Sequence, residues 1–271
     1  MSAPCLNRFE KPPLLRADSI SKAFGGVQAL LNVSFEVSEG TILGIIGPNG
    51  AGKTTLFNVI TSAYPPDSGQ LFLDRKKIQN RKVHELVRLG IARTFQNVEL
   101  FENMTALENV MVGQYTQTRC GIFAAAARLP WAVAEEKQAR EEAMALLSFV
   151  GIAQYAENRS GNLPFGWQRL LEIARALAAK PRLLLLDEPA AGLNAVETRR
   201  LGNLIERIRH QGVTILLVEH DMNLTMTICD RIIVLNYGKI LAHGTPEEIQ
   251  SNPAVMAAYL GTSEVSPLIY D

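Results

Sequence analysis

The sequence has few features of a secreted or membrane-spanning protein. Its 271 residues contain only three cysteines, Cys5, Cys120 and Cys229, which lie far apart and form neither a metal-binding spacing nor an evident disulfide framework. No apolar run approaches the roughly 20 residues of a membrane span. The N-terminal segment also lacks the apolar core of a secretory signal. We therefore expect a protein of a reducing compartment, either soluble or peripheral to a membrane.

An excess of charge is also missing. The 27 Lys and Arg residues balance the 27 Asp and Glu residues, so the chain carries no overall electrostatic footprint for nucleic acid, and no such partner is expected. Hydrophobic residues make up 47% of the chain. That share is sufficient for a core in one large or two small domains.

Apolar runs and helical periodicity predict an α/β fold. Residues 14–37 favour an antiparallel sheet, and "LLLLD" and "TILLV" suit strands buried on both faces of a parallel sheet. "RIIVLNYGKILAHG" predicts a hairpin that turns at Asn236–Gly238. Residues 100–160 are mostly helical in pattern, with an apolar face formed by Ala139, Ala143, Leu146, Leu147 and Val150. The core is thus split by an inserted helical block.

A phosphate-binding loop follows the apolar run "TILGII". The motif G-x-x-x-x-G-K-[ST] begins at Gly47 and opens a helix, where backbone N–H groups and the helix dipole attract phosphate. Lys53 can reach the β- and γ-phosphates, and the Thr54 hydroxyl can hold Mg²⁺. An ordinary glycine-rich turn is the alternative. The loop comprises Gly47, Pro48, Asn49, Gly50, Ala51, Gly52, Lys53, Thr54 and Thr55.

Polar residues follow the predicted parallel strands, where ligands bind in open α/β sheets. Asp187 ends one strand and would orient the water of a metal ion, and Glu188 could accept a proton from an attacking water. His220 lies just beyond a second strand and could meet the γ-phosphate, and Gln96 offers a neutral metal or water contact. The alternatives are a solvated turn for the carboxylates, a structural role for the histidine and a surface position for the glutamine.

A helix is predicted to begin near Trp167 and to stop at Pro181, but it has no conventional N-cap. The residues before it are Pro164, Phe165 and Gly166, and none has a side chain that can accept a hydrogen bond from the first helical N–H groups. Amides around Gly166, Trp167 and Gln168 are therefore predicted to be open to a ligand.

In this order and spacing, the motifs resemble those of the ATP-binding subunit of ABC transporters, from about residue 14 to residue 260. The resemblance implies a P-loop NTPase core with an N-terminal antiparallel β subdomain and a helical subdomain inserted at about 97–165. Residues 1–13 would be a lead-in and residues 261–271 a tail. It also implies an ATPase that uses ATP and Mg²⁺. Such a subunit would lie peripherally at the cytoplasmic face of the cell membrane.

The resemblance assigns roles to particular residues. Phe24 takes the place of a ring that stacks on adenine, with a β-sheet core aromatic as the alternative. Thr54, Gln96 and Asp187 would hold the metal, and Glu188, His220 and Lys53 would act in catalysis. Ala191–Asn194 would form the D-loop. The signature motif would contact nucleotide held by a second, opposed ATP-binding subunit. In this sequence the residues of the motif are Pro164, Gly166, Trp167 and Gln168.

This sequence departs from the family pattern at the signature and the D-loop. Pro164 replaces a serine, Phe165 replaces a glycine, Trp167 stands where Gln or Glu is common, and Asn194 stands where Asp is common. A lost hydrogen bond to a charged group costs about 1.5–3 kcal/mol. The composite site built with this signature is therefore expected to be weaker than the one built with this phosphate loop.

The departures and the segment "NPAVMAAYLGTSEV" are most similar to the ATP-binding subunit of branched-chain amino acid importers. Expected partners are a second ATP-binding subunit, identical or different, permease subunits and, indirectly, a periplasmic solute-binding protein. Alternatives are a urea or amide importer, a lipopolysaccharide exporter, a non-transport ABC ATPase, another P-loop enzyme such as a kinase, and a non-catalytic regulator. The apolar segment 121–134 would border the permease or pack on residues 139–150.

Overall fold

The computed structural model describes residues 13–115 and 130–260 and contains two sheets. The N-terminal sheet is antiparallel, and the pairing of β1 with β2 confirms the antiparallel sheet predicted for residues 14–37. The strands that complete this sheet were not predicted from the sequence. In the order in which they pair, its strands are β2 (Val27–Val37), β1 (Leu15–Phe24), β4 (Ser68–Leu73) and β5 (Lys76–Lys77).

The central sheet is parallel except for its edge strand β10, which pairs antiparallel with β9 through the predicted hairpin. Every residue of the three middle strands β3, β8 and β7 is buried, as the continuous apolar runs predict. In pairing order the strands are β10 (Lys239–Gly244), β9 (Arg231–Asn236), β3 (Ile42–Ile46), β8 (Thr214–Val218), β7 (Leu183–Asp187) and β6 (Ile91–Arg93).

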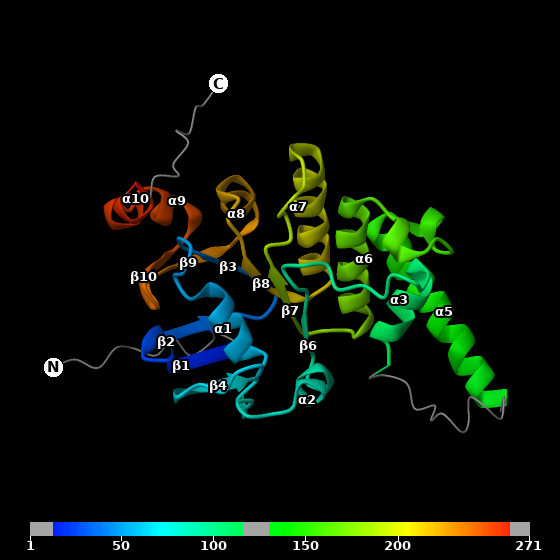
Figure 1. Cartoon of the computed structure of the whole chain (residues 1–271), viewed down its shortest axis with the longest axis horizontal. Coiled ribbons are helices and arrows are strands. Elements are labelled where there is room, and N and C mark those ends of the chain that lie inside the picture. The colour runs from blue at the N-terminus through cyan, green and yellow to red at the C-terminus, as the bar shows by residue number, and fades with distance from the viewer. Residues whose placement is uncertain (1–12, 116–129, 261–271) are drawn as a thin grey trace.

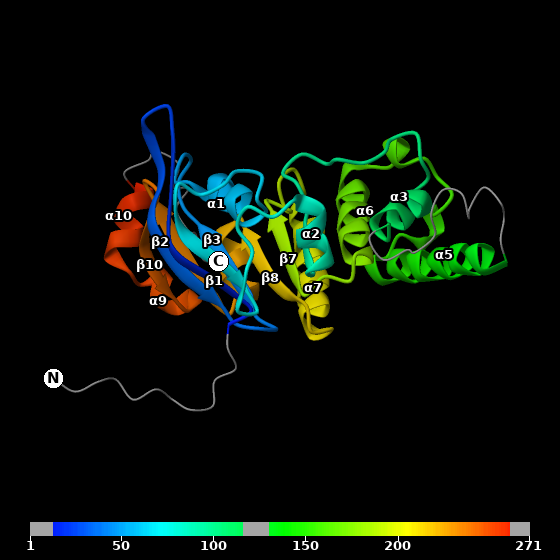
Figure 2. The ribbon, with the colours of Figure 1, turned by 90° about the horizontal axis from the view of Figure 1, so that it is seen from below.

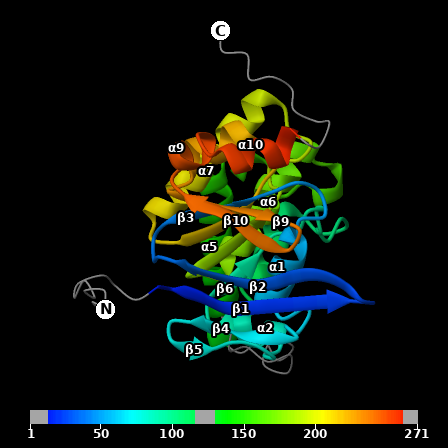
Figure 3. The ribbon, with the colours of Figure 1, turned by 90° about the vertical axis from the view of Figure 1, so that its left-hand side faces the viewer.

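Helix α1 (Lys53–Ile60) lies between the two sheets (Figures 1 and 3). Its Phe57 is fully buried and belongs to a core cluster that joins the N-terminal sheet to one face of the central sheet. Fully burying such a side chain contributes about 1.5–3 kcal/mol. The helix that carries the phosphate loop is therefore fixed from both sides.

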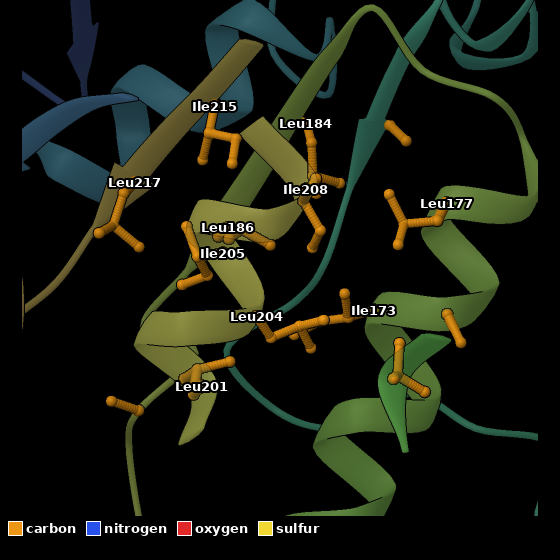
Figure 4. Close-up of a cluster of buried hydrophobic side chains, with 14 of the residues drawn as sticks. Ile173, Leu177, Leu184, Leu186, Leu201, Leu204, Ile205, Ile208, Ile215 and Leu217 are labelled. Carbon is orange, nitrogen blue, oxygen red and sulfur yellow. The ribbon is translucent and has the colours of Figure 1, made fainter. Parts of the chain in front are cut away.

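The opposite face of the central sheet is covered by α7 (Ala195–His210) and α8 (Met222–Ile228), and α9 (Pro246–Gln250) and α10 (Pro253–Leu260) follow β10. Figure 4 shows α7 projecting its apolar side chains toward those of β7 and β8. The labelled side chains of this layer are Leu184, Leu186, Leu201, Leu204, Ile205, Ile208, Ile215 and Leu217.

The remaining helices gather at the end of the molecule remote from the N-terminal sheet (Figures 1 and 2). They are α3 (Ala106–Gly113), α5 (Pro130–Val150), the 3₁₀ turns Ala153–Tyr155 and Ser160–Asn162, and α6 (Phe165–Ala178). The apolar face predicted for residues 139–150 is confirmed, since Ala143, Leu147 and Val150 are buried. The short helix α2 (Val83–Arg88) precedes β6.

The apolar segment 121–134 is only partly described. Residues 121–129 lie outside the described residues, and α5 begins at Pro130. Trp131 and Val133, near its start, are about half exposed, at 49% and 50%. Among the described residues, no helix combines the length and apolar character needed to cross a membrane.

Candidate functional site

The phosphate loop connects β3 to α1. Helix α1 starts at Lys53 without a side-chain cap, so its first amides open onto the loop. Gly47 is required by a close approach, because a Cβ there would lie 2.2 Å from the carbonyl oxygen of Leu235. The N–H of Gly238, in the β9–β10 turn, donates to the Ala51 carbonyl at 3.0 Å. The loop is therefore shaped and held by its neighbours.

Lys53 is buried within this loop. Its Nζ donates to the carbonyl oxygens of Gly47 at 2.6 Å and Pro48 at 3.1 Å. Burial lowers the pKa of the ammonium, and the charges of Glu188 and Asp187 oppose that shift. The cation thus faces both carboxylates, and a phosphate would replace its two carbonyl partners.

Asp187 ends β7 and is only 2% exposed. Its Oδ2 accepts a hydrogen bond from Nη2 of Arg93 at 2.7 Å, and Arg93 also donates to Asn58 of α1 and to Thr61, which follows α1. Desolvation raises the pKa of Asp187, and the guanidinium opposes the rise. Sequence reasoning missed Arg93. Its position at the end of a strand, three residues before Gln96, was the available signal.

Glu188, Gln96 and His220 come together although they lie in three separate loops. Glu188 Oε2 accepts from Nε2 of Gln96 at 2.8 Å, and Oε1 lies 2.6 Å from Nε2 of His220. The backbone of Glu188 is left-handed, with φ +47°, and its N–H donates to Val218 of β8 at 2.8 Å. Such a conformation is costly for a residue with a side chain and recurs at functional sites.

Glu219 is a second buried carboxylate that sequence reasoning missed. It accepts hydrogen bonds from the N–H groups of Ala190 at 2.7 Å, His220 at 3.0 Å and Asp221 at 3.3 Å. Desolvation raises its pKa against these hydrogen bonds. Glu219 therefore ties the turn after Glu188 to the segment that carries His220.

The start of α6 agrees with the sequence in one respect and differs in another. Pro164 occupies the N-cap position without a side-chain hydrogen bond, as predicted. The amides of Trp167 and Gln168, however, both donate to the Pro164 carbonyl, at 2.9 and 3.1 Å. Among the described residues, the amides of Phe165 and Gly166 have no hydrogen-bond acceptor. Of the three amides predicted to be open, only that of Gly166 is so, and the other open amide is that of Phe165, one residue earlier.

Trp167 and Gln168 also direct their side chains into their own chain. The Trp167 ring lies 4.0 Å from the ring of Tyr155, centroid to centroid. Nε2 of Gln168 donates to the carbonyls of Ser160 at 3.2 Å and Leu163 at 3.0 Å. Both side chains thus anchor α6 to the preceding turn.

The segment Ala191–Asn194 contacts the start of α6. A Cβ on Gly192 would lie 2.9 Å from the Phe165 ring, so the glycine, at φ +81°, makes room for that ring. The Asn194 side chain accepts from the N–H groups of Val196 and Glu197 and caps α7. Both departures from the family pattern therefore have structural roles in this chain.

Phe24 lies at the end of β1 and is 42% exposed, so the core-aromatic interpretation is wrong. Its ring meets that of Tyr64 edge to face, with centroids 5.3 Å apart. Nζ of Lys22 lies 5.3 Å from the Phe24 ring. Tyr64 was not predicted from the sequence.

The C-terminal helix also reaches the phosphate loop. Burial raises the pKa of Tyr259 in α10 to about 12, while the backbone N–H of Gly47 donates to its hydroxyl.

The residues beside the phosphate loop have the chemistry to hold a hard cation, because carboxylate, hydroxyl and amide oxygens are available from Asp187, Thr54 and Gln96. The second carboxylate oxygen of Asp187 accepts no hydrogen bond from the described residues.

Family comparisons agree with this geometry. Residues 30–191 match the ABC transporter family, and the chain belongs to it as an ATP-binding, ATP-hydrolysing cassette. Residues 239–265 match the branched-chain amino acid ATP-binding cassette transporter family. The chain is 46% identical over 250 residues to LivG of Salmonella typhimurium, named as a high-affinity branched-chain amino acid transport ATP-binding protein, covering 92% of this chain and 98% of that one.

Other relatives extend the comparison. BraF of Pseudomonas aeruginosa, with the same functional name, is 46% identical over the same shares of the two chains. The crystal structure of an ATP-binding cassette of an ABC transporter in its ADP conformation is 33% identical, with a TM-score of 0.81 over 93% of this chain and all of that chain. A dimeric cassette bound to ADP and Pi is 26% identical, with a TM-score of 0.74 over 86% and 98%. The P-loop fold is thus confirmed.

Proposed function

We propose that this chain hydrolyses ATP to drive the import of branched-chain amino acids. One observation supports ATP hydrolysis at this site. Gln96 and His220 both hydrogen-bond to Glu188, and Glu188 lies near the lysine of the phosphate loop. The names of LivG and BraF and the match of residues 239–265 support the solute class.

In the proposed reaction, the open amides of α1 and Lys53 bind the phosphates of ATP. Glu188 accepts a proton from the attacking water, and His220 and Lys53 stabilise charge that develops on the γ-phosphate. Mg²⁺, when bound, neutralises phosphate charge, and Thr54, Asp187 and Gln96 are its proposed ligands. Gln96 could serve both groups, because Nε2 donates to Glu188 and the amide oxygen would remain for the metal. Phe24 is proposed to stack on adenine.

The proposed assembly is a pair of ATP-binding subunits, in which the amides of Phe165 and Gly166 reach nucleotide bound by the partner. The dimer formed by a related cassette supports this arrangement. The pair would lie peripherally at the cytoplasmic face of the membrane against permease subunits, and a periplasmic binding protein would deliver the solute. Residues 14–260 would form one domain, with residues 97–165 as its helical insert.

The catalytic assignment is tested by Glu188→Gln in the assembled transporter. The change keeps the size of the side chain but removes the proton acceptor, and a general base is worth about 10²–10⁴ in rate. ATP hydrolysis should fall within that range while ATP binding persists. Glu36→Gln, on the exposed side of β2, is the matched control. Full hydrolysis by Glu188→Gln would eliminate Glu188 as the base.

The solute assignment has a separate test in reconstituted vesicles. ATP hydrolysis should be stimulated by a binding protein loaded with leucine, isoleucine or valine, and not by urea or a short amide. Stimulation by urea or an amide alone would move the chain to the related importers. Lipopolysaccharide-dependent hydrolysis would make it an exporter subunit.

A further inference from the structure

Two buried charged residues of α6 hold the backbone of the segment that carries Gln96. Arg169 and Glu172 have side chains only 3% and 2% exposed, and their closest charged atoms are 3.4 Å apart. Arg169 Nη1 donates to the Phe95 carbonyl at 2.8 Å, and Nη2 donates to the Gln96 carbonyl. The Phe95 N–H donates to Glu172 Oε1 at 3.0 Å.

These bonds add to two other contacts of the segment: the Thr94 N–H donates to the Leu185 carbonyl of β7 at 2.9 Å, and the Arg93 guanidinium lies 5.2 Å from the centroid of the Phe95 ring. The side chains of Phe95 and Gln96 are both exposed, so apolar burial does not hold them in place. Two backbone carbonyls and one N–H are bound by a pair of side chains on one helix. The position of the Gln96 backbone therefore follows α6, and so does the reach of its Nε2 to Glu188.

The same guanidinium also touches the start of α6. The Arg169 Cζ lies 5.3 Å from the centroid of the Phe165 ring, which in turn packs on Gly192. One side chain thus contacts both the Gln96 segment and the aromatic ring that replaces the family's glycine. A chain of direct contacts leads from Gly192 through Phe165 and Arg169 to Gln96.

We propose that Arg169, supported by Glu172, is a positioning residue that places Gln96 against Glu188. The inference rests on the proposed role of Gln96 at the hydrolytic site. Because the guanidinium is fixed to α6, any movement of that helix relative to the central sheet carries the Gln96 segment with it. The start of α6 and the attacking-water site are then coupled within one subunit.

A double-mutant cycle on ATP hydrolysis tests this coupling. Arg169→Gln and Gln96→Ala are each expected to reduce kcat about tenfold, and the double variant should be no slower than Gln96→Ala. Arg207→Gln on α7 is the control, because that guanidinium lies over the ring of Phe149 and, among the described residues, bonds to none of Phe95, Gln96 and Glu172. The proposal would be overturned if the rate losses of the two single variants multiplied in the double variant, or if Gln96→Ala kept full activity.

Hydrogen exchange supplies a readout that does not depend on activity. Arg169→Met with Glu172→Gln removes both charges, so that no unpaired charge is left in the interior even if Arg169→Gln folds poorly. The Phe95 amide, which donates to Glu172, should exchange at least about tenfold faster in this variant and at an unchanged rate in Arg207→Gln. Unchanged exchange would refute the positioning role. Full activity of Glu188→Gln would instead refute the proposed hydrolytic site and leave the exchange result standing.

Discussion

The carboxyl end of the central sheet and the start of α6 are both proposed to bind ATP, but they are built differently. At the sheet, charged and polar side chains are held within one chain, as in the pairs of Arg93 with Asp187 and His220 with Glu188. At α6, the residues around the open amides are Pro164, Phe165 and Gly166, and none supplies a polar side chain. One site is assembled by side-chain chemistry and the other by backbone alone.

This difference predicts unequal dependence on individual residues. A charged side chain aimed at developing charge acts in the transition state, and removing one such donor costs about 10²–10³ in rate. A helix end contributes about 0.3–1 kcal/mol through its dipole, with further help from its free amides. Substitutions at the carboxyl end of the sheet should therefore lower the rate of ATP hydrolysis more than substitutions at the start of α6.

Among the variants that compare the two sites, Lys53→Ala should have the largest effect. It removes the buried ammonium that faces Asp187 and Glu188, and ATP hydrolysis should fall by about 10²–10³ or more. The measurement is the steady-state ATPase rate in the assembled transporter, with Lys239→Ala, at the exposed start of β10, as control. A loss smaller than tenfold would remove Lys53 from the catalytic set.

Gly166→Asp comes next and tests the α6 side of the comparison. A carboxylate at the open amides should lower the steady-state ATPase rate of the assembled transporter by about tenfold, less than Lys53→Ala, because the dipole and the Phe165 amide remain. A Cβ at this position lies 2.8 Å from Oε1 of Glu197, so Gly166→Ala is the control that separates crowding from charge. Equal losses from Gly166→Asp and Lys53→Ala would contradict the unequal design.

The fold was predictable where burial dominates the pattern. Between Leu183 and Leu186 in β7, and after Thr214 in β8, every residue is apolar because both faces of the sheet are covered. The two-residue strand β5 consists of exposed Lys76 and Lys77, and its pairing with β4 is set by tertiary context rather than by sequence preference. Short edge strands of this kind leave no periodic signal.

The site was predictable as a set of residues but not as a set of contacts. Gln96, Glu188 and His220 follow strands, and strand ends mark the ligand edge of the sheet. Their hydrogen bonds depend on the left-handed backbone at Glu188, which no sequence pattern indicates. Arg93 and Arg169 were missed because an isolated arginine usually lies at the surface, and only the packing shows which carboxylate it meets.

Glu219→Gln is a smaller change on the sheet side. The carboxylate accepts from three N–H groups, and an amide has one oxygen to accept them, so we expect a loss of about 1–2 kcal/mol in the free energy of unfolding near pH 7. Chemical denaturation measures this loss. Glu206→Gln, a partly exposed position on α7, is the control.

The pH dependence of the same variant has a defined sign. Burial raises the folded-state pKa of Glu219 above its ordinary value of 4.5, so the native state binds more protons than the unfolded state in the interval above that value. The contribution of this titration to stability is complete below pH 4.5 and is lost as the pH rises through the folded-state pKa. The stability of wild type relative to Glu219→Gln should therefore decline across that interval. A rise would contradict the shift.

Tyr259→Phe should have the smallest effect, and it asks whether the sheet site extends to the C-terminal helix. The ring and its packing are kept, and only the hydroxyl that receives the Gly47 N–H is lost. A net hydrogen bond is worth about 0.5–1.5 kcal/mol, so ATP affinity should weaken by about two- to tenfold. Tyr237→Phe is the matched control, because that ring is 85% exposed in the β9–β10 turn. If Tyr259→Phe and Tyr237→Phe bound ATP with equal affinity, α10 would make no contribution to nucleotide binding at the phosphate loop. A loss confined to Tyr259→Phe would make the C-terminal segment, which matches the branched-chain amino acid transporter family, part of the nucleotide site.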